Sequence, residues 1–227
     1  MTGMDKKITR GKTFYLIETM LWHGQAGFPY LELHVERLER SARFFDFSFS
    51  RATVSGMLRD LSARLFARAE QAEKKFKVRC ILEPSGRFEI TDVERLERLN
   101  TPVTVDVSGQ RVDPGDIFLY HKTSNREFFN RERRRLEKEG LFDTLFLNNR
   151  GEITQGTITN LFVDSGEGQL LTPALRCGLL PGVLRQKMLK EGRAREEILG
   201  LDDISGAKAL FVGNSVRGLL RARLRVL

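Results

Sequence analysis

"FLYHKTSNREFFN", residues Phe118 to Asn130, places a lysine directly after an apolar run. The run Ile117–Tyr120 predicts a buried strand, and Lys122 follows at the point where that strand should turn. Two interpretations of Lys122 stay open. Either the lysine marks where the strand reaches water, or the strand presents the amine inside a cleft. In a cleft, desolvation would lower the pKa of the amine and make it a nucleophile toward a carbonyl.

Working outward from this stretch, hydrophobic periodicity predicts helices and strands along the whole chain. Before it we expect a strand (Thr13–Trp22), two helices (Leu31–Phe47 and Arg51–Glu73) and a strand, turn and strand (Lys75–Val93). After it we expect a charged helix, a hairpin (Asp143–Pro173), a helix (Leu179–Gly192) and then a strand, a glycine turn and a closing strand or short helix (Ala207–Leu227). The pattern predicts an α+β fold in two lobes, residues 1–108 and 109–227, that are joined near residues 105–115.

Composition indicates a soluble globular protein. Of the 227 residues, 41% are hydrophobic and 30% are charged, which is typical of a folded domain rather than a disordered chain. The sequence has no apolar run long enough to cross a membrane, and its charged start lacks the apolar region of a signal peptide. Cys80 and Cys177 show neither metal-ligand spacing nor a disulfide framework. We therefore expect a cytoplasmic protein with no bound metal.

The net charge of +8 leaves two interpretations of the basic segment "NRERRRLEKEG", Asn130 to Gly140. Such a segment can bind nucleic acid, or it can form the solvated face of an amphipathic helix. Its interleaved glutamates favour the helix, and no RNA-binding aromatic motif or zinc-finger spacing is present. We expect no nucleic-acid partner. A diffuse positive field also suits an enzyme with a small anionic substrate.

Two glycine turns predict anion contacts. "LLPGVLR" places Gly182 and the amides of Val183 and Leu184 at the start of a helix, where free N–H groups and the helix dipole attract phosphate. "FVGNSVRG" predicts a second anion-binding turn, in which Asn214 and Ser215 follow the end of a strand. Arg37, on the first predicted helix, can supply a guanidinium to the same anion. Together with Lys122, these groups suit an aldehyde cofactor that is held by its phosphate.

The motifs and their order resemble those of the fold-type IV pyridoxal-phosphate enzymes, the class IV aminotransferase family. The segments that carry the resemblance are "YLIETM" (Tyr15–Met20), "HVERL" (His34–Leu38), "HKTSNR" (His121–Arg126), "NNRGEITQGTITNLF" (Asn148–Phe162), "LLPGVLR" (Leu179–Arg185) and "NSVRG" (Asn214–Gly218). The family includes branched-chain and D-amino-acid aminotransferases and 4-amino-4-deoxychorismate lyase. The chain is most similar to that lyase and to the lyase-like domain fused behind aminodeoxychorismate synthase component I.

The resemblance implies a two-lobed fold of the D-amino-acid aminotransferase type, with pyridoxal 5'-phosphate in a cleft between the lobes. It implies that Lys122, in the second lobe, binds the cofactor covalently and shuttles the proton. It implies a homodimer. The implied cofactor contacts are Arg37, Lys122, Gln155, Val183, Leu184, Asn214 and Ser215, and the implied substrate contacts are Arg79 and Asn125.

Two departures from the family pattern bear on the reaction. Leu184 stands where aminotransferase relatives have a threonine that bonds the phosphate. Gln155 stands where the family has a glutamate that keeps the pyridine nitrogen protonated, unless another acid such as Glu152 reaches that nitrogen. Transamination needs this electron sink more than a lyase reaction whose product becomes aromatic. We therefore expect 4-amino-4-deoxychorismate lyase activity, giving 4-aminobenzoate and pyruvate for folate biosynthesis. A class IV aminotransferase and a degenerate cofactor-binding homologue are the alternatives.

Overall fold

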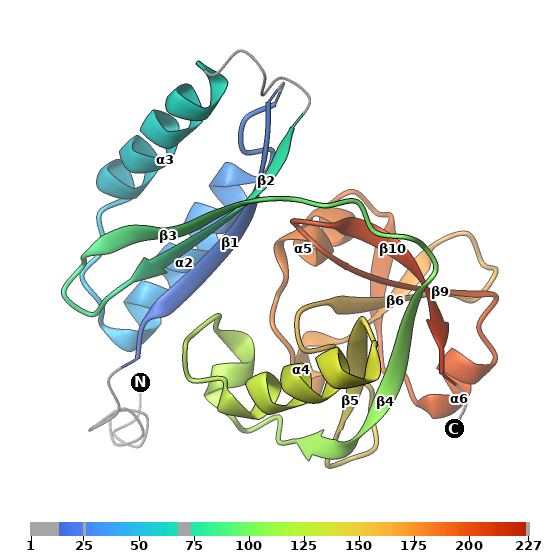
Figure 1. Ribbon diagram of the computed structural model, residues 1–227. Helices are drawn as coiled ribbons and strands as arrows, with labels where there is room; N and C mark the ends of the chain where they lie inside the picture. Colours follow the sequence, from blue (N-terminus) through green and yellow to red (C-terminus); the bar gives the residue numbers. More distant parts are fainter. Residues whose placement is uncertain (1–13, 25, 68–73, 226–227) are drawn as a thin grey trace. The chain divides into compact units, whose positions relative to one another are not determined.

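The computed structural model describes residues 14–24, 26–67 and 74–225. The chain divides into two compact units (Figure 1). The first comprises Met1–Leu96 with Lys122–Asn125, and the second comprises Glu97–His121 with Arg126–Leu227. This division differs from the expected boundary after residue 108. It also groups Lys122 with the first unit rather than the second, because the backbone of Lys122 pairs with a strand of the first unit.

The first unit is an antiparallel sheet in the order β1-β2-β3 with two helices. In chain order its described elements are β1 (Leu16–His23), α2 (Leu31–Phe45), α3 (Arg51–Phe66), β2 (Lys75–Leu82) and β3 (Phe88–Arg95). The order of strands and helices predicted for this half of the chain is confirmed. Residue 13 of the predicted first strand and residues 68–73 of the predicted second helix lie outside the described residues.

Side chains that alternate along β1 form the core of the first unit. Met20 and Trp22 point to one face of the sheet and are buried. Helix α2 packs on β1 and contributes Val35 and Leu38 to this interior, and α3 lies beside α2 (Figure 1). Glu18 has the same parity along β1 as Met20 and Trp22. The strand therefore carries one carboxylate into an otherwise apolar interior.

The second unit is built on a seven-stranded mixed sheet in the order β5-β4-β10-β9-β6-β7-β8. Its described strands are β4 (Val103–Val112), β5 (Asp143–Asn148), β6 (Asn160–Asp164), β7 (Leu170–Pro173), β8 (Ala194–Glu197), β9 (Ala209–Asn214) and β10 (Gly218–Leu224). Its described helices are η2 (Ile117–Tyr120), α4 (Glu127–Glu139), η3 (Leu175–Cys177), α5 (Val183–Lys190) and α6 (Leu201–Ser205). Each of the two units combines helices with its own sheet, which confirms the predicted α+β fold class.

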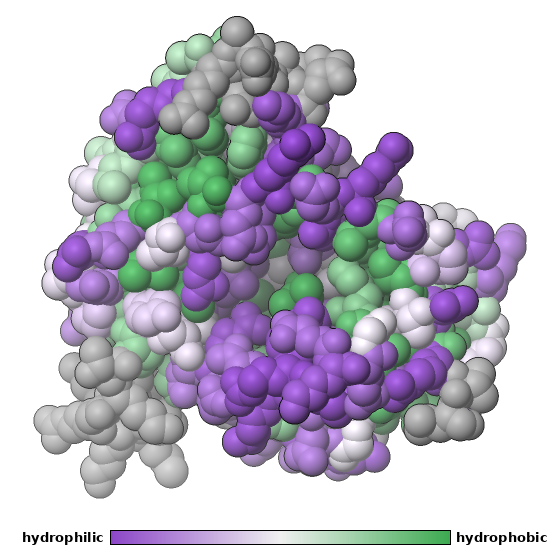
Figure 2. Space-filling model, viewed as in Figure 1, coloured by the Kyte–Doolittle hydropathy of each residue, from purple (hydrophilic) through white to green (hydrophobic). Residues whose placement is uncertain are grey.

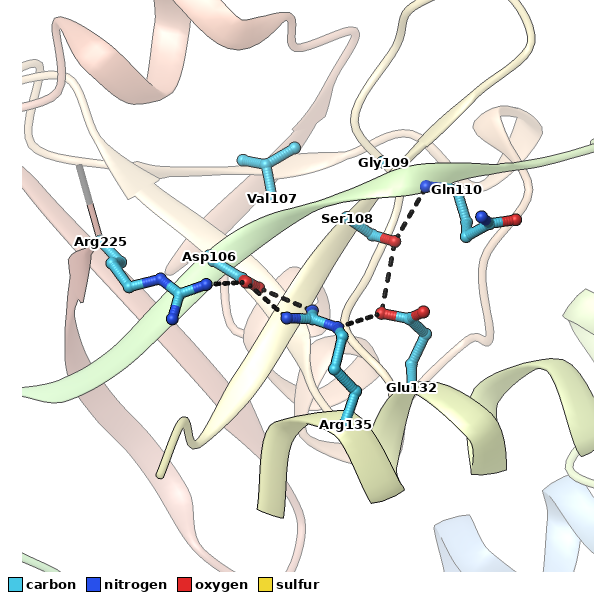
Figure 3. Close-up of a pocket in the computed structure, with 8 residues that line it drawn as sticks. All are labelled: Asp106, Val107, Ser108, Gly109, Gln110, Glu132, Arg135 and Arg225. Atoms are coloured by element: carbon cyan, nitrogen blue, oxygen red, sulfur yellow. Dashed lines mark hydrogen bonds and ion pairs between the residues drawn. The ribbon is translucent and has the colours of Figure 1, made fainter. Parts of the chain in front are cut away.

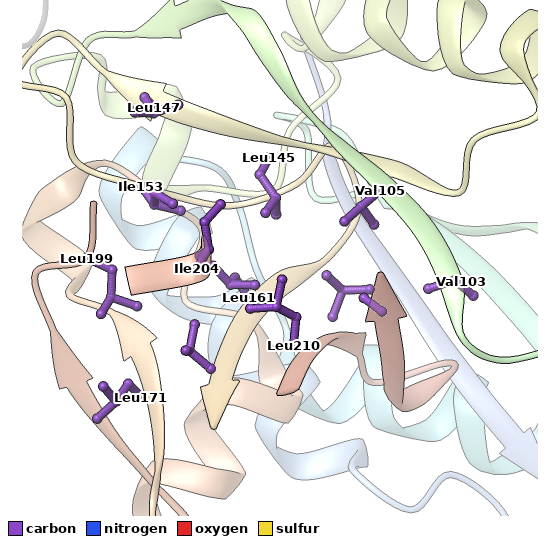
Figure 4. Close-up of a cluster of buried hydrophobic side chains, with 13 residues drawn as sticks. Val103, Val105, Leu145, Leu147, Ile153, Leu161, Leu171, Leu199, Ile204 and Leu210 are labelled. Carbon is purple, nitrogen blue, oxygen red and sulfur yellow. The ribbon is translucent and has the colours of Figure 1, made fainter. Parts of the chain in front are cut away.

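Aliphatic side chains from most of these strands meet in one buried cluster (Figure 4). The cluster comprises Val103, Val105, Leu145, Leu147, Ile153, Leu161, Val163, Leu171, Leu199, Ile204, Leu210, Val212 and Ala222. Helix α5 packs on β8 and β9 through Leu184 and Met188. This packing fixes the start of α5 relative to the sheet, which matters because that start carries the predicted anion site.

Two expectations near Lys122 are wrong. Ile117–Tyr120 forms the 3₁₀ helix η2 rather than a strand, because the Asp116 carboxylate caps the N–H of Phe118 at 2.9 Å. The Tyr120 hydroxyl then bonds the carbonyl of Pro114 and closes the turn. The expected junction at residues 105–115 also differs, because most of it belongs to β4, which pairs in parallel with β5 and β10.

The charged helix predicted after Lys122 is α4. Hydrophilic side chains gather over it (Figure 2), and its arginines form ion pairs with carboxylates of α4 and β4. Leu136 is its buried side chain. Such an ion-paired surface agrees with the interpretation of this segment as the solvated face of an amphipathic helix.

None of the helices in the described ranges is both long enough and apolar enough to cross a membrane.

Candidate active site

Lys122 is held against the edge of β1 by backbone hydrogen bonds. The N–H of Ile17 donates to the carbonyl of Lys122 at 2.8 Å, and the N–H of Ser124 donates to the carbonyl of Tyr15 at 2.9 Å. The Ser124 hydroxyl accepts a further bond from the N–H of Tyr15 at 3.1 Å. These bonds fix the backbone of the half-buried Lys122 beside the strand that carries Glu18.

Glu18, His34 and Arg37 form a buried cluster that sequence reasoning did not identify. The carboxylate of Glu18 accepts from Nε of Arg37 at 2.8 Å and from a terminal nitrogen of Arg37 at 2.6 Å. The same carboxylate lies 2.6 Å from Nδ1 of His34. His34 and Arg37 are three residues apart on α2, so both face β1. The three residues are 2%, 2% and 4% exposed, respectively.

The charges of this cluster are mutually compensated. Burial alone would raise the pKa of Glu18, but the adjacent Arg37 and His34 outweigh burial and hold that pKa at about 2. Burial lowers the pKa of His34, and the positive charges of Arg37 and Lys122 lower it further, although Glu18 opposes them. The cluster is therefore an ionised Glu18–Arg37 pair with a neutral imidazole. The influence of Lys122 on His34 places the lysine in the same electrostatic environment.

Arg37 was predicted to contact a phosphate, and His34 was given no role. In the structure, the guanidinium of Arg37 is oriented by Glu18. Nε2 of His34 is buried and has no hydrogen-bond partner among the described residues. Buried polar atoms are nearly always paired, so an unpaired one in an ionic cluster indicates a position for a ligand atom.

In the second unit, the start of α5 offers free amides. Gly182 precedes the helix without a side-chain cap, and the first turn contains no acidic residue. The N–H groups of Val183 and Leu184 have no acceptor within the described part of the chain. A side chain at Gly182 would collide with the amide of Asn160. This position is thus restricted to glycine, and the bare amides and the helix dipole favour an anion.

Two buried amide side chains brace the turn that leads into α5. The side-chain oxygen of Gln155 accepts from the N–H of Leu180 at 3.0 Å, and the side-chain nitrogen of Asn160 donates to the Leu180 carbonyl at 3.1 Å. Gln155 and Asn160 are 8% and 4% exposed. Gln155 therefore contacts Leu180, which precedes Val183 by three residues, a stretch of at most roughly 11 Å of extended chain.

Asp143 organises the loop between Gln155 and Asn160. Its fully buried carboxylate accepts from the N–H and hydroxyl of Thr157 at 2.7 and 2.6 Å, and from the hydroxyl of Thr159 at 2.7 Å. The hydroxyls of the two threonines therefore bind the buried Asp143 carboxylate and stabilise the loop.

Asn214 and Ser215 lie at the turn between β9 and β10, and Ser215 is buried. The side-chain oxygen of Asn214 accepts from the N–H groups of Val216 and Arg217 at 3.0 and 2.9 Å. Its nitrogen donates to the carbonyl of Ile158 at 3.2 Å. The Asn214 side chain thus joins the turn to the Gln155–Asn160 loop.

The two predicted substrate contacts belong to the first unit. Arg79 is half-buried on β2, where it is paired with Thr19 of β1 and Asp92 of β3. The N–H of Asn125 donates to the Thr123 hydroxyl at 3.2 Å, three residues beyond Lys122. Both assignments stay predictions.

Glu152, the alternative acid for the pyridine nitrogen, is engaged elsewhere. Its carboxylate accepts from Arg150 and from the side-chain amide of Asn148, each at 2.6 Å. These two bonds hold its pKa at about 2. Glu152 stabilises the hairpin turn, which leaves Gln155 as the residue of this segment that braces α5.

A separate pocket of about 330 Å³ lies in the second unit (Figure 3). Asp106 at its wall accepts from Arg135 and Arg225, and Glu132 pairs with Arg135 and with the Ser108 hydroxyl. Because these charges pair with one another, the pocket presents no uncompensated group to a ligand. None of the predicted site residues lines it.

The structure thus distributes the predicted site over two sets. Lys122, Arg37, Arg79 and Asn125 belong to the first unit, whereas Gln155, Val183, Leu184, Asn214 and Ser215 belong to the second. Glu18, His34, Asp143 and Asn160 were missed. A carboxylate in the middle of the apolar strand "YLIETM" was the one local signal for Glu18.

Comparison with known proteins supports the resemblance. The family model described as Amino-transferase class IV matches residues 15–224. A crystal structure from Mesorhizobium loti, provisionally named an amino-acid aminotransferase, is 38% identical, with a TM-score of 0.84, 93% of this chain covered and 100% of that chain.

Two curated relatives carry different provisional names. A Schizosaccharomyces pombe protein named aminodeoxychorismate lyase is 26% identical over 219 residues, which cover 92% of this chain and 89% of that protein. A Thermotoga maritima protein named branched-chain-amino-acid aminotransferase is 23% identical over 225 residues, which cover 91% of this chain and 75% of that protein.

Proposed function

Because the chain belongs to the class IV aminotransferase family, we propose that it is a lyase that converts 4-amino-4-deoxychorismate to 4-aminobenzoate and pyruvate for folate biosynthesis. The family consists of enzymes that use pyridoxal 5'-phosphate. This cofactor supplies an aldehyde that combines with amines and an aromatic ring that withdraws electrons from the bond being broken.

The residues present fit this cofactor. The first unit offers the amine of Lys122, the guanidinium of Arg37 and the unpaired Nε2 of His34. The second unit offers the free amides at the start of α5 and the amide side chain of Gln155. An amine, a cation and bare amides are the groups that an aldehyde and a phosphate require.

Lys122 has two tasks in the proposed reaction. Its amine would hold the cofactor aldehyde, and the 4-amino group of the substrate would take its place there. The released amine then removes the proton from ring carbon C4 and delivers a proton to the departing enolpyruvyl group. Arg79 and Asn125 are proposed to bind the carboxylates of the substrate.

The side chain of Gln155 is the reason for proposing a lyase rather than an aminotransferase. Its side-chain oxygen is taken up by the N–H of Leu180, so the end that remains is an NH₂ group, which only donates hydrogen bonds. A donor beside the pyridine nitrogen does not stabilise the protonated ring. Formation of an aromatic product assists the lyase reaction without that stabilisation. Transamination lacks this assistance in both of its half-reactions.

Amino transfer is the second candidate. The relative from Mesorhizobium loti, at 38% identity, carries an aminotransferase name. Lys122 would then move a proton from the α-carbon of the amino acid to the carbon that carries the cofactor aldehyde, and a 2-oxo acid would be required as acceptor.

One assay separates the candidates. The protein is incubated with pyridoxal 5'-phosphate and 4-amino-4-deoxychorismate, and 4-aminobenzoate and pyruvate are measured. Release of both without an amino acceptor supports the lyase. Turnover of amino acids that depends on a 2-oxo acid supports the aminotransferase. Cofactor binding without either activity would identify a degenerate homologue.

We also propose a homodimer in the cytoplasm that acts on this small anionic substrate without nucleic acid. Light scattering should give twice the chain mass of 26.0 kDa. A fully active monomer would contradict the dimer.

A further inference from the structure

The cluster of Glu18, His34 and Arg37 cannot balance a phosphate dianion as it stands. The charge of Arg37 is already paired with the carboxylate of Glu18 through two hydrogen bonds of 2.8 and 2.6 Å. The imidazole of His34 is neutral, since burial and two nearby cations disfavour its charged form. A dianion placed beside Arg37 would therefore also lie close to the negative Glu18.

His34 has the geometry to supply the missing positive charge. The carboxylate of Glu18, 2.6 Å away, accepts the proton of Nδ1 and so fixes the imidazole in one tautomer. Nε2 is then the nitrogen that is free to gain a proton. This atom is buried and lacks a partner among the described residues. Once protonated, it becomes a donor that an anion can accept.

The charged groups that act on His34 come from three elements. Glu18 lies on β1, Arg37 lies one turn further along α2, and Lys122 lies in the segment that pairs with β1. Glu18 favours the charged imidazole, and the two cations oppose it. An arriving dianion offsets both cations at once, and the protonated form then becomes favourable.

We propose that His34 is a second ligand of the phosphate beside Arg37, and that binding of the dianion takes up one proton at Nε2 of His34. The inference rests on the proposed function, which places the cofactor phosphate at Arg37. Glu18 is the positioning residue, because it orients Arg37 and holds the tautomer of His34. The anion site is thus linked to pH through a residue that is not among the implied cofactor contacts.

The direction of the linkage follows from the sign of the shift. In the free protein the pKa of His34 lies below its usual value because of burial, and according to the proposal the bound dianion raises it. Between these two values the complex holds one more proton than its separate components. Affinity should therefore fall about tenfold for each unit of pH rise within that window. Outside the window, His34 should contribute no pH dependence to the affinity.

The test uses pyridoxine 5'-phosphate, whose alcohol cannot react with Lys122 as an aldehyde does. Titrations are made by calorimetry near pH 8, where a phosphate monoester with a second pKa of about 6 is already a dianion. Two buffers of different ionisation enthalpy give the number of protons exchanged. We expect an uptake of about one proton in the wild type. His34→Gln should lose this uptake and bind more weakly, whereas the matched control His23→Gln should keep both.

Imidazole nitrogen NMR of the wild type provides a readout that does not depend on a folded variant. The signals of His34 should change from a neutral tautomer to the doubly protonated form when pyridoxine 5'-phosphate is added. A neutral His34 in the complex, or uptake that persists in His34→Gln, would overturn the inference. If pyridoxal 5'-phosphate still attaches to Lys122 in that case, the proposed function stands. Failure of both phosphates to bind would overturn the inference and the proposed function together.

Discussion

The side-chain oxygen of Gln155 accepts a hydrogen bond of 3.0 Å from the N–H of Leu180, two residues before the glycine that caps α5. Because the donor is a backbone amide, it fixes which end of the Gln155 side chain faces the turn. A glutamate here would accept the same bond with one oxygen and present the other. Gln155 therefore stabilises the turn that precedes the anion site at the start of α5. It also determines that its free end is a hydrogen-bond donor rather than a carboxylate oxygen.

Gln155→Glu should shift the balance of the two candidate activities. The added carboxylate would favour a protonated pyridine ring, so transaminase activity should rise relative to lyase activity, on the order of tenfold for a charge-assisted hydrogen bond. Both rates are measured in wild type and variant. The control is Glu152→Gln, which removes a carboxylate held by Asn148 and Arg150 and should leave the ratio unchanged. An unchanged ratio in Gln155→Glu would mean that Gln155 lies away from the ring.

Lys122→Ala should abolish turnover and covalent attachment of the cofactor together, since Lys122 is the amine that is proposed to react with the cofactor aldehyde. Borohydride treatment of the loaded wild type should add the cofactor mass to the peptide that contains Lys122. The exposed Lys138 of α4 provides the control, and Lys138→Ala should retain labelling and activity. Wild-type pyruvate release from Lys122→Ala would disprove the assigned role.

The free energy of unfolding of the first unit should depend on pH through the ionisation of Glu18. Its pKa is lowered from 4.5 to about 2 in the folded protein, so its contribution is present above pH 4.5 and is lost as the pH falls toward 2. A shift of this size corresponds to a loss on the order of 3 kcal/mol in the free energy of unfolding. Urea unfolding at several acidic pH values measures it.

Two variants isolate this effect. Glu18→Gln should lower the stability at neutral pH by about 3–5 kcal/mol, because Arg37 stays buried without a counter-charge, and should flatten the acid dependence. Glu36→Gln, on the exposed side of the same helix, should change neither. An acid dependence that survives in Glu18→Gln would assign it to other carboxylates.

Asp143→Ala should loosen the loop that carries Gln155. The substitution leaves the hydroxyls of Thr157 and Thr159 and the N–H of Thr157 without their buried acceptor. We expect a loss on the order of 3 kcal/mol or more in the free energy of unfolding, and weaker cofactor binding. Asp164→Ala removes a half-buried carboxylate that accepts one hydrogen bond, from the N–H of Gly166, and should cost well under half as much. Equal effects of the two variants would contradict a special role for Asp143.

Local patterns predicted most helices and strands, because the spacing of apolar residues within a segment reflects which of its faces is buried. The alternation in β1 and the apolar stripe of α2 are examples. The same reasoning failed for Ile117–Tyr120, where the Asp116 cap and the Tyr120–Pro114 bond favour a 3₁₀ turn over a strand. It failed for β4 because Asp106 and Ser108 interrupt the apolar pattern, and their partners Arg135 and Glu132 lie far along the chain.

The sequence by itself determined the order of the elements, the α+β class and the chemical groups available: the amine of Lys122, the guanidinium of Arg37 and the glycine before α5. Only the tertiary structure decided which groups meet. Glu18 joins His34 and Arg37, Gln155 joins Leu180, and Lys122 joins β1 through bonds between residues distant in sequence. Such pairings depend on which buried polar groups folding brings within about 3 Å of one another. Local propensity and periodicity do not predict which of these polar groups pair.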